Sequence, residues 1–180
     1  MRYAALLLCL ALPVLSAQDT VRVGYTAIQP LEASFNGRIE KFDIDNPIRL
    51  IGSSRGVYLD GYGVVLTAEV DLLPSASLTP FRPKYTDPQK EQLRVRKLER
   101  VGQLRDIMRG MLVDTAAALD TVPLDQQIVV AVTIFYWEWE KRQGLPSQIL
   151  MRAPRRTLVE YKAGGIGRPA LDAALKVREY

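Results

Sequence analysis

A serine motif is the first pattern in this chain that suggests chemistry. Gly52-Ser53-Ser54-Arg55-Gly56 matches G-x-S-x-G, which puts Ser54 at the position of a hydrolase nucleophile. Such a serine needs an imidazole to take its proton, and the chain contains no histidine. The residues after the motif predict a strand, whereas hydrolases have a helix there. We therefore interpret Ser54 as a residue of a bend or bulge.

Two carboxylates offer a second kind of chemistry. Glu69 and Asp71 lie two residues apart on the predicted outer face of a β-hairpin. Retaining glycosidases use two carboxyl groups about 5 Å apart, one of which has a pKa raised by burial. A carboxylate-dependent glycan hydrolase is therefore one alternative function. Two solvated carboxylates on an open sheet face explain the same pattern.

Trp137-Glu138-Trp139-Glu140 is the most unusual tetrapeptide of the chain. In an extended conformation both indoles point one way and both carboxylates the other. Exposed paired indoles stack on sugar rings or anchor a partner protein. The competing interpretation puts Trp137 at the end of the core and Trp139 under a polar loop. Trp137 and Trp139 are the predicted partner contacts.

A basic segment runs from Lys90 to Arg109. It holds seven Lys and Arg against three Asp and Glu, a net charge of +4 on one predicted helix. A basic helix can lie on anionic lipid or on a cell-wall polymer, which makes an anionic-surface docking protein a further alternative. A solvated helix face explains the same charges.

The N-terminal residues predict export. Arg2 precedes an apolar run at residues 4–15, and Ser16-Ala17 then offers a signal-peptidase site after Ala17. The run is shorter than the roughly 20 residues that cross a bilayer, so no transmembrane segment is predicted. Cys9, the only cysteine, lies within this signal. The mature chain is expected to have no disulfide, no catalytic residue, no metal site and no cofactor.

Apolar spacing predicts the elements of the first half. Ile28, Leu31, Phe35, Ile39 and Phe42 form one stripe of a helix over residues 26–42. Residues 48–73 read as a hairpin with Asp60-Gly61 as a two-residue turn, a register that leaves Arg55 pointing inward unless a bulge turns it out. Residues 88–119 predict a long helix capped by Asp87, which either projects or bends near Gly102 or Gly110.

The second half predicts another hairpin and short helices. The β-branched run within 126–137 is typical of a central strand covered on both faces, and 148–151 reads as its neighbour. A short helix over 154–163 and a helix from Arg168 to Leu175 follow, with a strand at the end. Residues 18–180 are thus expected to form a single α+β domain with a mainly antiparallel sheet of about four strands. The alternative is a mixed sheet in which 126–137 runs parallel to a hairpin strand.

Two stretches carry a family resemblance. Residues 55–70, RGVYLDGYGVVLTAEV, and residues 139–150, with the core GLPSQI, resemble a family of uncharacterised exported bacterial proteins. The resemblance spans most of the mature chain. It implies a bacterial envelope origin, and it brings no activity, ligand or site residue.

Together these patterns favour a non-enzymatic binding or assembly module of the bacterial cell envelope. The predicted location is periplasmic or extracellular, and the predicted partner is an envelope protein or a glycan. Export argues against nucleic acid as the partner, and the charge surplus of +4 over the whole chain is too small to name one.

Overall fold

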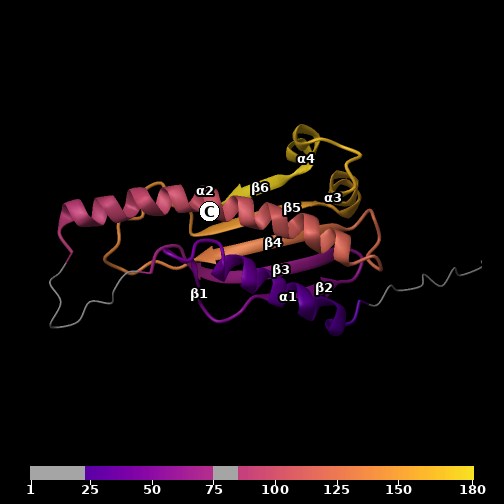
Figure 1. Ribbon diagram of the computed structural model, residues 1–180, viewed down its shortest axis with the longest axis horizontal. Helices are drawn as coiled ribbons and strands as arrows, with labels where there is room; N and C mark the ends of the chain where they lie inside the picture. Colours follow the sequence, from indigo (N-terminus) through magenta and orange to yellow (C-terminus); the bar gives the residue numbers. More distant parts are fainter. Residues whose placement is uncertain (1–22, 75–84) are drawn as a thin grey trace, which may run out of the picture.

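The computed structural model describes residues 23–74 and 85–180. The predicted signal peptide, with its cleavage site at Ala17, lies outside the described residues. Four helices and six strands follow one another along the chain (Figure 1). They are α1 (Tyr25–Glu40), β1 (Arg49–Leu50), β2 (Arg55–Leu59), β3 (Gly63–Asp71), α2 (Asp87–Ala118), β4 (Gln127–Ile134), β5 (Gln148–Pro154), α3 (Arg155–Lys162), α4 (Arg168–Ala174) and β6 (Lys176–Glu179).

The α+β class is confirmed, but the predicted sheet is wrong in two respects. The sheet has six strands and is mixed, in the order β1-β3-β4-β5-β6, with β2 beside β1 on the same edge of β3. β3 and β4 are parallel, and every other pair is antiparallel. The alternative arrangement is therefore the correct one. α2 carries the chain back to the end of the sheet at which β3 begins, so the next strand, β4, runs in the same direction as β3.

The hairpin β2–β3 forms with a register one residue away from the predicted one. Leu59 pairs with Gly63, which leaves three residues in the turn, and Gly61 in it has a φ of 70°. The shift puts Gly56 opposite Leu66 on the buried face and turns Arg55 outward beside Thr67. In the observed register Arg55 points outward, so no bulge is needed to turn it away from the core.

Gly56 is also where α1 meets the sheet. A Cβ on Gly56 would lie 2.3 Å from Cγ2 of Ile28 and 2.8 Å from Cδ2 of Leu66, so only glycine lets the helix approach this closely. The predicted stripe of α1 is confirmed, because Ile28, Leu31, Phe35 and Ile39 are all buried. Phe42 of the same prediction lies beyond the helix and is exposed.

The predicted long helix forms as α2, and of the two forms left open it takes the projecting one, with no break at Gly102 or Gly110. Its cap is Thr86 and not Asp87: the Thr86 hydroxyl accepts from the backbone N–H of Gln89, and Oε1 of Gln89 accepts from the N–H of Thr86. The first buried residue of α2 is Lys97. The N-terminal part of the helix extends past the sheet (Figure 1).

The helices cover one face of the sheet, and α1 and α2 lie over it side by side (Figure 1). Alternate strand residues on that face are buried, such as Leu66, Val130 and Met151. β4 was predicted to be covered on both faces, and its second face is covered only in part: Val129 is buried, Ala131 half-buried and Thr133 exposed. A continuous β-branched run fixes the strand but does not determine how many layers cover it.

In residues 23–74 and 85–180, no helix is both long enough and apolar enough to span a bilayer.

Candidate functional site

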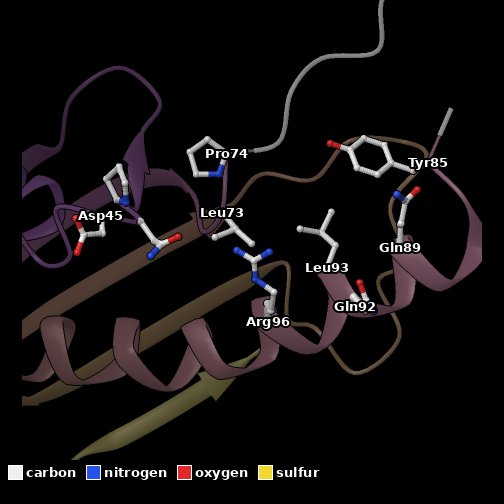
Figure 2. A pocket seen from close by; sticks show the side chains of 10 residues that line it. Asp45, Leu73, Pro74, Tyr85, Gln89, Gln92, Leu93 and Arg96 are labelled. Carbon is white, nitrogen blue, oxygen red and sulfur yellow. The ribbon is translucent and has the colours of Figure 1, made fainter. Parts of the chain in front are cut away.

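A cavity of about 450 Å³ lies beside the projecting part of α2 (Figure 2). It is bordered by the loop after α1, the chain just beyond β3, and the N-terminal turns of α2. Its apolar lining is Pro47, Leu73, Pro74 and Leu93, and its polar lining is Asp45, Asn46, Tyr85, Gln89, Gln92 and Arg96. The volume and the mixture of an apolar wall with a few polar groups are typical of small-ligand sites.

Helical spacing brings the α2 side of the cavity together. Gln89, Gln92 and Arg96 are three and four residues apart, which places them on one face of the helix. The side chain of Gln92 makes no hydrogen bond to the described residues, whereas Gln89 uses its amide oxygen in the N-terminal cap. The face presents amide groups that can donate to a ligand and accept from it.

Arg96 is the charged group of the cavity. Figure 2 shows its side chain projecting from α2 toward Leu73. Within the described part of the chain, its guanidinium has neither an ion-pair partner nor a hydrogen-bond partner. It differs in this from the six other basic residues of the Lys90–Arg109 segment, which pair with acids of the same chain: Lys90 with Asp87, Arg94 with Glu91, Lys97 with Glu140, Arg100 with Asp43, Arg105 with Glu179, and Arg109 with Asp106 and Asp172.

An aromatic pair holds the outer wall. Tyr85 lines the cavity, and its ring stacks on Trp139 with centroids 4.4 Å apart and planes 9° apart. Trp139 comes from the segment between β4 and β5, which also contacts α2 where Arg94 donates to the carbonyl of Gln143 over 3.0 Å. The stack and this hydrogen bond fix the wall against the projecting helix.

A buried ion cluster braces the floor. Nζ of Lys97 lies 2.6 Å from Oε2 of Glu140 and 3.5 Å from Oδ1 of Asp71, and all three side chains are at most 2% exposed. Arg49 pairs with the second oxygen of Asp71 over 3.2 Å. Oδ1 of Asp71 also accepts from the N–H of Leu73, a lining residue. The cluster ties the end of β3, α2 and the segment after β4 into one unit.

Tyr136 extends this cluster. The ammonium of Lys97 lies 5.1 Å from its ring centroid, and its hydroxyl donates to the carbonyl of Pro146 over 2.8 Å. Burial raises the pKa of the Tyr136 hydroxyl, and the nearby Glu140 carboxylate raises it further. The phenol therefore stays neutral. The side chains of Lys97, Asp71 and Glu140 are closed to solvent and offer no surface to a substrate.

The predicted contact residues take separate places. β4 ends at Ile134, and the N–H of Glu140 donates to the carbonyl of Trp137 in a turn, so the two indoles do not form one extended pair. Trp137 lies edge-on to Phe135 with centroids 5.0 Å apart, and Trp139 backs the Tyr85 wall. Both tryptophans are half-buried. Of the two, Trp139 is the one that lies next to the cavity.

The other candidates for chemistry do not meet in the cavity. Ser54 is buried, and its hydroxyl donates to the carbonyl of Glu32 over 2.9 Å. Glu69 is exposed on the helix-free face of the sheet, whereas Asp71 belongs to the buried cluster. Asp45 is the one carboxylate among the described residues that line the cavity.

Tyr85 and Asn46 were not predicted as site residues, and Arg96 was predicted only as one of the seven cations of a basic helix. The shared helix face of Gln89, Gln92 and Arg96 was the available signal, but nothing in the sequence places Asn46 opposite it. Comparison of the chain with protein families, curated proteins and solved structures finds no match.

Proposed function

We propose that the protein is a non-enzymatic binding module of the bacterial envelope that holds an acidic glycan in the cavity beside α2. The observation that carries this proposal is the position of Arg96. An exposed guanidinium without a partner in the described chain faces a cavity whose other polar groups are mainly amides. The predicted signal peptide supports an envelope location for the module.

Each part of the lining suits one part of an acidic sugar. The guanidinium of Arg96 can bind a carboxylate through two parallel hydrogen bonds. The amides of Asn46 and Gln92 and the carboxylate of Asp45 can bind hydroxyl groups. The ring of Tyr85, already stacked on Trp139, offers an apolar surface to the C–H face of a pyranose.

Binding is favoured over hydrolysis by the number of carboxylates. Glycoside hydrolysis uses two carboxyl groups, about 5–9.5 Å apart, on opposite sides of the scissile bond. In the described lining Asp45 has no second carboxylate to work with. The two acids suggested by the sequence, Glu69 and Asp71, lie in different environments.

The test is a titration with a glucuronic acid-containing disaccharide and with the matching neutral disaccharide, followed by calorimetry and by tryptophan fluorescence. We expect the acidic sugar to bind and the neutral sugar to bind more weakly. Arg96→Gln should weaken binding of the acidic sugar by roughly 10-fold or more, because hydrogen bonds to a charged group are worth about 1.5–3 kcal/mol.

Lys90→Gln is the matched control, since Lys90 lies on the same helix, does not line the cavity and already pairs with Asp87 at 3.7 Å. Equal losses in the two variants, or no binding of either sugar, would contradict the proposal. Release of new reducing ends from the disaccharide would instead support the hydrolase alternative.

A further inference from the structure

The second face of the sheet carries a different surface. Direct cross-strand partners share a face, so the register gives two adjacent rows on the side away from α1 and α2. The first row is Val57, Val65, Val129, Arg152 and Lys176, and the second is Arg55, Thr67, Ala131, Leu150 and Arg178. The ion pair between Glu179 and Arg105 of α2 confirms which side of β6 faces the helices. In these two rows Val129 is buried, and the other nine residues are exposed or half-buried.

An apolar band crosses the two rows diagonally. It starts at Val57 on β2, passes Val65 and Val129, steps to Ala131, and ends at Leu150 on β5. Val57 is 48% exposed and its neighbour Leu59 45%. Val65, Ala131 and Leu150 are half-buried and Val129 is 3% exposed, so the band is most open at its β2 end. Parallel strands such as β3 and β4 are normally covered on both faces, whereas this face of the pair is only partly covered.

Cations flank the band on both sides. Arg55 lies on one side, and Arg152, Lys176 and Arg178 lie on the other. None of the four forms an ion pair with the described chain, and Arg152 only reaches the hydroxyl of Tyr62 at 3.4 Å. Glu69 is the one exposed acid on the strands of this face. The face therefore presents an apolar centre within a positive border.

We propose that this face docks an acidic amphipathic helix of a partner protein. From Val57 to Leu150 the band crosses three strand spacings and one two-residue step, which is about 16 Å. That length equals about three turns, or about 11 residues, of α-helix. A helix with one apolar stripe and acids on both flanks matches the band and its border.

Charge argues against two occupants that this chain itself could supply, namely a second copy of the chain and its own segments 1–22 and 75–84. Two copies of the chain stacked through this face would bring two positive borders together. Residues 1–22 and 75–84 contain four basic residues and a single acid, Asp19, so they do not complement the face either. The cavity lies elsewhere, past the end of β3 and beside the N-terminal turns of α2, so this proposal does not depend on it.

The test uses labelled synthetic peptides of about 15 residues, with leucines at i, i+4, i+7 and i+11 in several registers and glutamates on both flanks. Fluorescence anisotropy with the full chain is the measurement. We expect binding that weakens as salt is raised, because exposed charge pairs are screened. A shuffled peptide of the same composition, which has no apolar stripe, should bind at least about tenfold more weakly.

Variants connect the binding to the face. Arg55→Gln/Lys176→Gln removes one cation from each border and should weaken binding about tenfold. Lys41→Gln/Arg156→Gln is the matched control, since both residues are exposed and lie off the face. Val57→Asn should also weaken binding, through the apolar band.

Three outcomes would overturn the proposal. They are equal binding of the shuffled peptide, equal loss in the control variant, and absence of binding by every acidic amphipathic peptide in the set. Cosedimentation with phosphatidylglycerol vesicles, in the absence of peptide binding, would assign the face to a lipid surface instead.

Discussion

The basic segment of α2 and the helix-free face of the sheet both carry a surplus of cations, but the fold treats them differently. Six of the seven cations between Lys90 and Arg109 pair with acids of the chain, several of them from distant segments, such as Asp43, Glu140 and Glu179. The four cations on the sheet face have no such partner in the described residues. Clustering in the sequence therefore does not locate the surface that is free to bind.

The difference has a physical reason. A cation held by an internal acid contributes little to the field outside the molecule, whereas an unpaired one keeps its attraction for an anion. The cations of α2 lie one to five residues apart in sequence, and several of them are reached by acids from distant parts of the fold. The sheet-face cations are scattered between residues 55 and 178, and only the strand register assembles them.

The largest expected loss of stability comes from removing the charge of Lys97, the cation that pairs with two buried acids. Lys97→Met leaves the buried carboxylates of Asp71 and Glu140 without their ammonium and should lower the free energy of unfolding by about 3–5 kcal/mol. Urea denaturation measures it. Lys90→Met, which removes an exposed pair at 3.7 Å from Asp87, should cost about 1 kcal/mol or less. Similar losses in the two variants would refute the structural role of the cluster.

A smaller loss is expected at Arg100. Its guanidinium donates to Asp43 over 3.0 Å and to the carbonyl of Asn46, and the residue is nearly buried. Arg100→Met should cost about 1.5–3 kcal/mol, because hydrogen bonds to charged groups are lost while Asp43 keeps access to water. Thermal unfolding of the variant tests this, and a neutral result would show that the pair contributes nothing.

Substitutions on the sheet face should leave stability almost unchanged. Lys176→Gln and Arg178→Gln are each expected to shift the free energy of unfolding by about 0.5 kcal/mol or less, since neither side chain has an ion-pair partner among residues 23–74 and 85–180. The same urea titration applies. A loss comparable to that of Arg100→Met would mean that these cations have a structural role, and the contrast between the two regions would fail.

The smallest effect concerns pH. The hydrogen bond from Arg94, with the nearby charges of Arg94 and Lys141, lowers the pKa of the Glu91 carboxyl despite some desolvation. A lowered pKa in the folded state means that this contribution to stability is present above the ordinary carboxyl pKa and is lost as the pH falls through the folded value. NMR titration should give a lower midpoint for Glu91 than in Arg94→Gln. An unchanged midpoint would show that the pair is not formed in solution.

Local patterns predicted the helices well. The stripe of α1, the length of α2, and the final helix and strand from Arg168 onward follow from residues that are neighbours in sequence. The β2–β3 register failed by one residue, because Asp60-Gly61 fits a two-residue turn and the third turn residue, Tyr62, gives no signal of its own. The parallel pairing of β3 with β4 depends on where α2 returns the chain, which no local pattern encodes.

The candidate site was only partly predictable. Trp139 was singled out by the unusual tetrapeptide that contains it. Its stacking partner Tyr85 precedes α2 in the sequence, whereas Trp139 follows β4, so no local pattern connects the two. The cavity joins Asn46, Leu73 and Arg96 from three segments. Arg96 was indistinguishable in sequence from its six basic neighbours, because what sets it apart is that no acid of the described residues forms an ion pair with it.

The parallel ladder between β3 and β4 also has a consequence for how the chain folds. Val65 and Val129 pair although the whole of α2 separates them in sequence, whereas β2 and β3 are joined by a turn of only three residues. Closing the longer loop costs more chain entropy, so we expect the hairpin to form early and the central ladder late. Destabilising the middle of α2 should then slow refolding in stopped-flow experiments, while changes in the exposed turn after β2 should not.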